Sequence, residues 1–277
     1  MLNISRSDVT DAPFPHVIKQ GLLDPQFYQS LRADFPTQDS FAEQTELSGG
    51  AGSRTGKGTG FDIYRGDDAY TALIGRSAAW KEFDSWINSP SFVEKFAEIF
   101  GPDLDRLGCA VTVDPQAYDH DYVEGREVLT EKPTLASKAR EFTRKILPAK
   151  SPEHMPIFSR LDVERSVGGY LKPPHCDRQN RLCSLILYFT DLAAEGIEGG
   201  DLSLFRHKNK TDPVQHERHP RPEDVETVAT LRPTENLGVF FPCSNNSYHG
   251  VSALQSQSAA RDFLYINLSV AGHSAWR

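Results

Sequence analysis

Three residues of the chain could together bind a metal ion: His175, Asp177 and, far downstream, His249. Alternate residues of an extended segment point to the same side, so His175 and Asp177 could both face one point from the end of a strand. Two imidazoles and one carboxylate form the ligand set typical of mononuclear non-haem Fe(II) sites, which leaves coordination positions open for reactants. A structural zinc site would instead have a closed tetrahedral set, usually with thiolates. These residue types therefore predict a catalytic iron centre.

The surroundings of these residues set them apart from a surface His-x-Asp tripeptide. His175 follows a segment with glycines and prolines and precedes the stretch 181–190, in which both alternating faces are largely apolar. Such a strand is buried on two sides, as a central strand beneath helices would be. His249 follows the strand-like stretch 237–242, and Arg261 begins a further alternating stretch. We therefore expect these side chains at the ends of core strands.

In their order, these stretches resemble the 2-oxoglutarate/Fe(II)-dependent oxygenases, and within them the prolyl 4-hydroxylase-like branch. That branch shows an H-x-D motif, a strand ending in Tyr and an apolar residue, and a G-G-[DE]-L/T motif. It continues with a G-x-x-x-F-P strand, an H-G-V motif and a basic residue. The matching stretches here are LILYF at 185–189, GGDLSLF at 199–205, NLGVFFP at 236–242 and HGV at 249–251. The N-terminal stretch PFPHVI also looks like the usual opening of this family.

The resemblance implies an α+β fold: a double-stranded β-helix (jelly-roll) core with N-terminal helices that buttress one sheet. His175, Asp177 and His249 match the iron ligands. Arg261 matches the base that pairs with the distal carboxylate of 2-oxoglutarate, a contact for which the planar guanidinium is well suited. Tyr188 matches a tyrosine that donates to the same carboxylate in some members, and a core aromatic role is its alternative. The implied cofactors are Fe(II), 2-oxoglutarate as cosubstrate and O2, with ascorbate as a candidate reductant.

The elements that must position these residues begin with helices. Asp24 followed by Pro25 is a helix start signal, and the apolar residues after it recur on one face. Apolar residues at helical spacing predict further helices over about 68–100, closed by Gly101. The stretch 13–18 is typical of a short strand.

The second half of the chain changes to short β-branched and aromatic stretches separated by turns, which is typical of an α+β chain. We predict strands at 157–165, 181–190, 201–206, 225–231, 237–242 and 261–270. The glycine-rich stretch 47–60 predicts a surface loop or lid, and a polar stretch with a helix at 133–146 predicts an insertion over the core. The whole, 1–277, is then one domain, with N-terminal strand, helices and lid (1–110), a helical insertion (111–156) and the jelly-roll core (157–272).

The composition limits the classes of partner. The 277 residues include 38 acidic and 30 basic side chains, a formal net charge of −8, and 38% are hydrophobic. An acidic chain is a poor binder of nucleic-acid backbones, and no stretch is apolar for long enough to cross a membrane. Four cysteines without C-x-x-C spacing indicate reduced thiols. We therefore expect a cytoplasmic protein without nucleic-acid or membrane partners, with a homodimer left open.

The substrate pocket is harder to predict. Tyr170 is expected to line it near the iron. Arg178 and Arg181 follow the H-x-D motif and could meet an anionic group of the substrate, with ordinary surface salt bridges as the alternative. Asp162 and Glu164 share one face of the strand 157–165 with Arg160 and could bind a cationic substrate such as an amino acid.

The resemblance implies hydroxylation of an unactivated C–H bond of a small molecule, an amino acid or a natural-product intermediate, with release of succinate and CO2. A carboxylate at Asp177 disfavours halogenation, whereas desaturation and cyclisation stay open. The alternatives are a peptidyl-prolyl (protein) hydroxylase and, from another class, a non-catalytic jelly-roll binding or sensor module. A cupin-like isomerase, or an oxygenase that works without 2-oxoglutarate, would leave Arg261 without a purpose.

Overall fold

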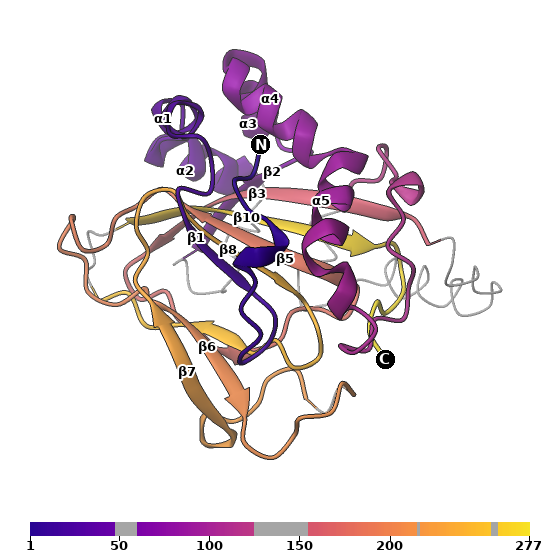
Figure 1. Cartoon of the computed structure of the whole chain (residues 1–277). Helices are drawn as coiled ribbons and strands as arrows, with labels where there is room; N and C mark the ends of the chain where they lie inside the picture. Colours follow the sequence, from indigo (N-terminus) through magenta and orange to yellow (C-terminus); the bar gives the residue numbers. More distant parts are fainter. Residues whose placement is uncertain (48–59, 125–154, 215–216, 256–259) are drawn as a thin grey trace.

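The computed structural model describes residues 1–47, 60–124, 155–214, 217–255 and 260–277 (Figure 1). Two antiparallel sheets form its centre. The six-stranded sheet has the order β1 (Val17–Gln20), β8 (Leu237–Pro242), β5 (Arg181–Tyr188), β10 (Ala260–Val270), β3 (Ile157–Val167) and β2 (Gly60–Tyr64). The four-stranded sheet has the order β4 (Lys172–His175), β9 (His249–Val251), β6 (Leu202–His207) and β7 (Val225–Leu231). Two such sheets joined by crossovers confirm the predicted jelly-roll core of an α+β fold.

Helices cover one side of the six-stranded sheet, and the four-stranded sheet lies on its other side (Figure 1). They are α1 (Pro25–Ala33), α2 (Gln38–Leu47), α3 (Asp68–Arg76), α4 (Ala78–Ile87) and α5 (Pro90–Phe100). None of the helices in the described part of the chain carries an apolar stretch long enough to span a bilayer. The helical layer confirms the predicted buttress.

The helix ends follow from local chemistry. Oδ1 of Asp24 accepts hydrogen bonds from the backbone N–H groups of Gln26 and Phe27 at 2.9 and 3.1 Å, so the predicted start of α1 is confirmed. Helix α5 ends at Gly101, as predicted, but this glycine has right-handed dihedrals, φ −47° and ψ −44°. The chain continues there into a short 3₁₀ turn instead of reversing through a left-handed glycine.

Strand β5 separates two hydrophobic layers, because its side chains alternate between the two faces of the sheet. Cys183, Leu185 and Leu187 belong to the core under the helices, whereas Ile186 and Tyr188 belong to the core between the sheets. Every residue of the strand is buried, which confirms the predicted burial on two sides. Each large apolar side chain buried in this way contributes about 1.5–3 kcal/mol.

The sequence patterns did not predict every element. Helix α2 and the strands β2, β4 and β9 were not expected, although β4 and β9 carry two of the candidate metal ligands. Most of the stretch predicted as a glycine-rich lid, and the whole helix predicted at 133–146, lie outside the described residues.

Candidate metal centre and active site

The structure brings the three predicted metal ligands together at the end of the four-stranded sheet. His175 ends β4 and His249 begins β9, and the two residues are directly paired across these antiparallel strands. Asp177 follows two residues after His175. One ligand atom from each side chain lies within 4.8 Å of the others, and all three residues are at most 5% exposed. Two imidazole nitrogens and one carboxylate oxygen at this spacing fit an Fe(II) ion.

Backbone carbonyl groups orient both imidazoles. Nδ1 of His175 lies 2.9 Å from the carbonyl oxygen of Pro173, and Nδ1 of His249 lies 3.0 Å from that of Ser247. A carbonyl oxygen can only accept, so Nδ1 donates and the Nε2 lone pair is left to bind a metal. Burial lowers the pKa of both histidines, which keeps them in the neutral, metal-binding form.

Several side chains surround the Asp177 carboxylate, the Cys243 thiol at 3.4 Å among them. Its Oδ1 accepts hydrogen bonds from Nη1 of Arg181 at 3.0 Å and from the Tyr265 hydroxyl at 2.8 Å. Its Oδ2 accepts from the Ser184 hydroxyl at 2.8 Å and lies 3.9 Å from Nε2 of His249. Burial alone would raise the pKa of Asp177, but the Arg181 guanidinium and the nearby histidines hold that pKa well below its usual value. The carboxylate is therefore ionised and fixed in direction before any metal binds.

These contacts decide between two alternatives for Arg181. The sequence left open whether Arg181 meets an anionic group of the substrate or forms an ordinary salt bridge, and its guanidinium forms a buried ion pair with Asp177. The contacts of Ser184 and Tyr265 with this carboxylate were not predicted. Ser184 could have been found from the alternation of β5, since it shares the inner face with Tyr188.

Arg261 is the second residue of β10 and is only 2% exposed. Its Nη1 donates to the carbonyl oxygen of Gly200 at 2.8 Å, and its guanidinium lies 4.6 Å from the centre of the Phe263 ring. Its Nε atom is buried without a hydrogen-bond partner, and no carboxylate of the described residues forms an ion pair with it. A buried cation costs several kcal/mol unless it is paired, so this guanidinium fits the carboxylate of a ligand.

The Gly199–Gly200 turn shapes the wall beside Arg261. Both glycines have left-handed backbone conformations, with φ +75° and +76°. A Cβ atom on Gly199 would lie 1.8 Å from the backbone oxygen of Ala253, and one on Gly200 would lie 2.8 Å from Cδ1 of Leu254. Only glycine at these two positions allows this close approach to residues 253 and 254, with the carbonyl group of Gly200 turned to Arg261.

Two tyrosines complete this end of the site. Tyr188 is 1% exposed, and among the described residues its hydroxyl has no hydrogen-bond partner. Burial raises its pKa to about 12, so the hydroxyl remains a proton donor near neutral pH. Its ring lies 5.7 Å from the guanidinium carbon of Arg261, and the ring of Tyr170 lies 5.4 Å from the same atom. Both tyrosines could donate to an anion that Arg261 binds.

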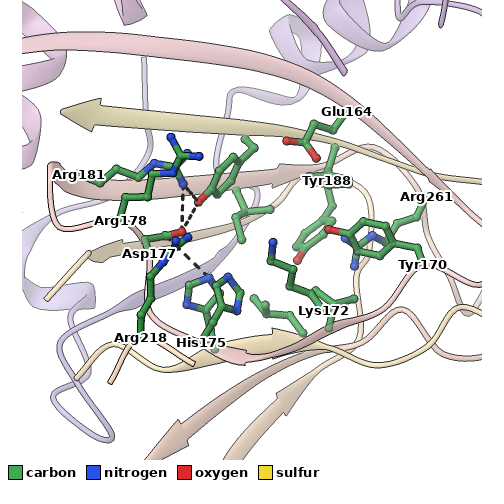
Figure 2. A pocket seen from close by; sticks show the side chains of 16 residues that line it. Glu164, Tyr170, Lys172, His175, Asp177, Arg178, Arg181, Tyr188, Arg218 and Arg261 are labelled. Carbon is green, nitrogen blue, oxygen red and sulfur yellow. Dashed lines mark hydrogen bonds and ion pairs between the residues drawn. The ribbon is translucent and has the colours of Figure 1, made fainter. Parts of the chain in front are cut away.

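These groups line one cavity of about 170 Å³ (Figure 2). It contains the three candidate metal ligands and, as predicted from the sequence, Arg261, Tyr188, Tyr170 and Arg178. Further charged residues that the sequence did not single out also line it, namely Lys172 and Arg218.

Asp162, predicted as a substrate ligand, does not line this cavity. Its side chain is fully buried, and its Oδ1 lies 2.6 Å from Nε of Arg160. The carboxylate that reaches the cavity from the same face of β3 is Glu164. The shared face of β3 thus predicted one wall of the cavity correctly. The ion pair with Arg160 turns Asp162 away, so that Glu164 is the carboxylate that faces the cavity.

One family profile matches the part of the chain that holds this site. Residues 161–265 match the profile of the 2OG-Fe(II) oxygenase superfamily. Similar solved structures include a prolyl 4-hydroxylase of Phytophthora capsici, with 14% identity, a TM-score of 0.44, and coverage of 92% of this chain and 59% of that one. A Pseudomonas putida prolyl-4-hydroxylase has 12% identity, a TM-score of 0.47, and coverage of 98% and 100%. The rice dioxygenase for auxin oxidation has 10% identity, a TM-score of 0.41, and coverage of 92% and 73%.

The chain thus spans 59% of the length of the Phytophthora structure, and no curated protein matches it. The matched profile, in contrast, covers the stretch that holds the site. It includes His175, Asp177, His249 and Arg261, together with the strands β5 to β9. Residues 161–265, and with them all four of these side chains, thus match the 2OG-Fe(II) oxygenase superfamily.

Proposed function

We propose that this protein is a 2-oxoglutarate-dependent Fe(II) dioxygenase that hydroxylates an unactivated C–H bond of a small molecule and releases succinate and CO2. The observation that carries the proposal is the position of Arg261. Its buried guanidinium, with an unsatisfied Nε atom, lines the same cavity as His175, Asp177 and His249. 2-Oxoglutarate has one end that chelates a metal and another that needs a cation, and this cavity offers both.

The residues of the chain bind and orient the reactants. His175, Asp177 and His249 would hold the iron, and Arg261 with Tyr188 would hold the distal carboxylate of 2-oxoglutarate. When bound, Fe(II) supplies the activation of O2 that is coupled to oxidative decarboxylation of the cosubstrate. The fixed Nδ1–carbonyl hydrogen bonds hold both imidazoles in the tautomer that leaves Nε2 to bind the metal.

Apolar side chains restrict water around the site. Ile186, Leu202, Val251 and Phe263 line the cavity between its polar groups, and all four are at most 9% exposed. Apolar walls that exclude water strengthen the electrostatic interactions between charged groups in the cavity. They also protect reactive species from side reactions.

The cavity walls favour a small polar substrate over a proline residue of a protein. Four charged side chains besides Arg261 and the Asp177–Arg181 pair line the cavity, and a proline ring offers nothing for them to bind. The volume of about 170 Å³ also suits a small molecule. An amino acid or a natural-product intermediate is therefore the substrate that we propose.

We also propose that the protein works in a reducing compartment, the cytoplasm. All four cysteines are buried free thiols, which supports this proposal, since proteins of oxidising compartments usually pair them.

Succinate release from the protein reconstituted with Fe(II) and 2-oxoglutarate tests the function. We expect panels of amino acids and related small molecules to stimulate it, and Arg261→Gln to raise the KM for 2-oxoglutarate with little change in metal affinity. Arg261→Lys should restore part of the binding, and Arg76→Gln, which changes an exposed arginine, should behave as the parent protein. Thermal unfolding of each variant shows that it is folded.

Other outcomes would favour the alternatives. If only proline-containing peptides stimulate succinate release, the substrate is a residue of a peptide and not a small molecule. If the parent, His175→Ala and Asp177→Ala released the same amount of succinate, the protein would not be an enzyme of this class. A binding or sensor module would then be the better reading.

A further inference from the structure

The orientation of Arg261 depends on one turn of the chain, residues 199–201. The carbonyl oxygen of Gly200 accepts a hydrogen bond from Nη1 of Arg261 at 2.8 Å, and among the described residues it is the only acceptor found for this guanidinium. The turn precedes β6, which begins at Leu202, so it lies outside the strand itself. The contacts that hold this turn therefore also set the direction of Arg261.

Arg232 binds the turn on both sides of Gly200. This arginine directly follows β7, which ends at Leu231. Its Nη1 atom donates to the carbonyl oxygen of Gly199 at 3.2 Å and to the carboxylate of Asp201 at 3.0 and 3.3 Å. One planar guanidinium thus holds the residue before Gly200 and the residue after it, with charge-assisted hydrogen bonds on one side.

The same guanidinium holds the loop that leads into the turn. Its Nη2 atom donates to the carbonyl oxygens of Leu192, at 3.4 Å, and of Ile197. These two residues belong to a small buried cluster against which Tyr170 packs. The ring of Tyr170 lies beside Arg261 (Figure 2). Arg232 therefore stabilises the segment that supplies both a polar and an aromatic neighbour of Arg261 with support.

Backbone hydrogen bonds hold the turn from another side. The N–H group of Gly200 donates to the carbonyl oxygen of Ser252 at 3.2 Å, and the N–H group of Ser252 donates to that of Asp201 at 3.0 Å. Gly199 and Gly200 are both left-handed, and glycine loses more conformational freedom on folding than any other residue. We therefore expect the turn to need the side-chain contacts as well as the backbone hydrogen bonds.

We propose that Arg232 is a positioning residue for 2-oxoglutarate and for its selection over 2-oxo acids that lack the distal carboxylate. Arg232 is not among the described residues that line the cavity, so it acts through the turn 199–201 on Arg261. This inference rests on the proposed function, which assigns the distal carboxylate to Arg261. Without Arg232, the Gly200 carbonyl would be held less firmly, and the buried guanidinium would be less well oriented before the ligand binds.

Two probes of equal chain length test the proposal by binding. 2-Oxoglutarate and 2-oxopentanoate both chelate a metal through the 2-oxo acid group, but only 2-oxoglutarate carries a distal carboxylate. The protein is loaded with Ni(II) in place of iron and titrated with each acid by calorimetry. We expect Arg232→Gln to weaken 2-oxoglutarate about 10-fold, the effect of about one hydrogen bond to a charged group, and to leave 2-oxopentanoate unchanged. A general loss of structure would weaken both acids.

Two further variants separate the role of the turn from that of the fold. Asp201→Asn removes the charge that pairs with Arg232 but leaves the carbonyl contacts of Arg232 in place. It should weaken 2-oxoglutarate about 3-fold or more, and this carries the test if Arg232→Gln does not fold. Arg206→Gln is the matched control, because it removes an exposed ion pair with Glu226 between β6 and β7. It should bind both acids as the parent does, and thermal unfolding shows that each variant is folded.

The outcomes separate this inference from the proposed function. If the parent prefers 2-oxoglutarate and Arg232→Gln and Asp201→Asn keep that preference, or if they weaken the two acids equally, the inference is overturned. Succinate release by the Fe(II) protein would in that case still support the dioxygenase. If the variants lose the preference but the parent releases no succinate with any molecule of the panels, the positioning role stands and the proposed function falls. A parent that binds both acids equally well would overturn both.

Discussion

Nη1 of Arg181 lies 3.0 Å from Oδ1 of Asp177, the carboxylate that faces His175 and His249. Both residues are at most 8% exposed, so this ion pair is almost completely shielded from water. With Tyr265 on the same oxygen and Ser184 on the other, the carboxylate cannot rotate freely. The first strand residue of β5 thereby fixes the orientation of a candidate metal ligand.

Replacement of Arg181 should weaken metal binding. Arg181→Gln leaves Asp177 buried without its cation, and loss of such a partner of a metal ligand typically costs about 10- to 100-fold in metal affinity. Titration of the metal-free protein with Co(II), followed by absorbance, measures this directly. Arg181→Lys should recover part of the loss, and an unchanged affinity in Arg181→Gln would show that Ser184 and Tyr265 suffice to hold the carboxylate.

The Gly200 position should control binding of 2-oxoglutarate. In Gly200→Ala the new Cβ would lie 2.8 Å from Leu254 and force a left-handed alanine, so the carbonyl group bound to Arg261 must shift. We expect a loss of about 1–3 kcal/mol in stability and a raised KM for 2-oxoglutarate.

Gly196→Ala is the matched control for this change. Gly196 is also left-handed, with φ +64°, but a Cβ there meets nothing within 4 Å. It should lower Tm through backbone strain alone and leave the KM for 2-oxoglutarate unchanged. Equal KM values for the two variants would disprove a role of the Gly200 turn in the site.

Removal of the Tyr188 hydroxyl should affect binding more than stability. Among the described residues no hydrogen bond to this buried hydroxyl is found, so Tyr188→Phe removes none within that part of the protein. If the hydroxyl donates to 2-oxoglutarate, the KM for this cosubstrate rises about 10-fold.

Tyr28→Phe provides the comparison. Its hydroxyl donates to the backbone oxygen of Tyr188 at 3.2 Å on the helix side of the sheet, away from the cavity. This variant should lower Tm while its KM for 2-oxoglutarate stays at the parent value. If Tyr188→Phe has the parent KM for 2-oxoglutarate, Tyr188 is a core aromatic and does not bind this cosubstrate.

His16 should make stability depend on pH. Its side chain is 3% exposed, its Nδ1 lies 2.8 Å from the backbone oxygen of Phe14, and burial lowers its pKa below the ordinary 6.5. The unfolded chain then binds a proton at a higher pH than the folded one, so stability is fully present above pH 6.5 and is lost as the pH falls through that value and towards the lower, folded pKa.

Denaturant unfolding at a series of pH values between about 7 and 5 tests this. We expect His16→Asn, whose amide can still donate to Phe14, to reduce the slope of the unfolding free energy against pH. A slope equal to that of the parent would mean that other buried groups, not His16, cause the dependence.

Strong local signals made much of this fold predictable. Strand β5 and the helix start at Asp24 follow from alternation and capping, which act within a few residues. Strands β4 and β9 are four and three residues long, and β4 contains two prolines, so no periodic pattern could reveal them. These two strands form by pairing with each other, and this pairing of distant parts of the chain places His175 opposite His249.

The residue types of the site could be predicted from the sequence, but the contacts between these residues could not. The spacing of His175 and Asp177, with the resemblance, led to the candidate ligands. The choice between Asp162 and Glu164 was beyond the sequence, because both lie on one face of β3 and only the position of Arg160 distinguishes them. For the same reason the sequence could not decide whether Arg181 meets the substrate or forms a salt bridge, and it did not indicate Asp177 as the partner.

The alternation of β5 also limits how this protein can evolve. Leu185 and Leu187 face the helices, while Ser184 and Tyr188 face the site, so insertion or deletion of a single residue would exchange the two sets. Leucines would then enter the polar cavity and a serine would enter the helix-covered core. Substitutions can accumulate one by one along this strand, but its length is under selection from both faces at once.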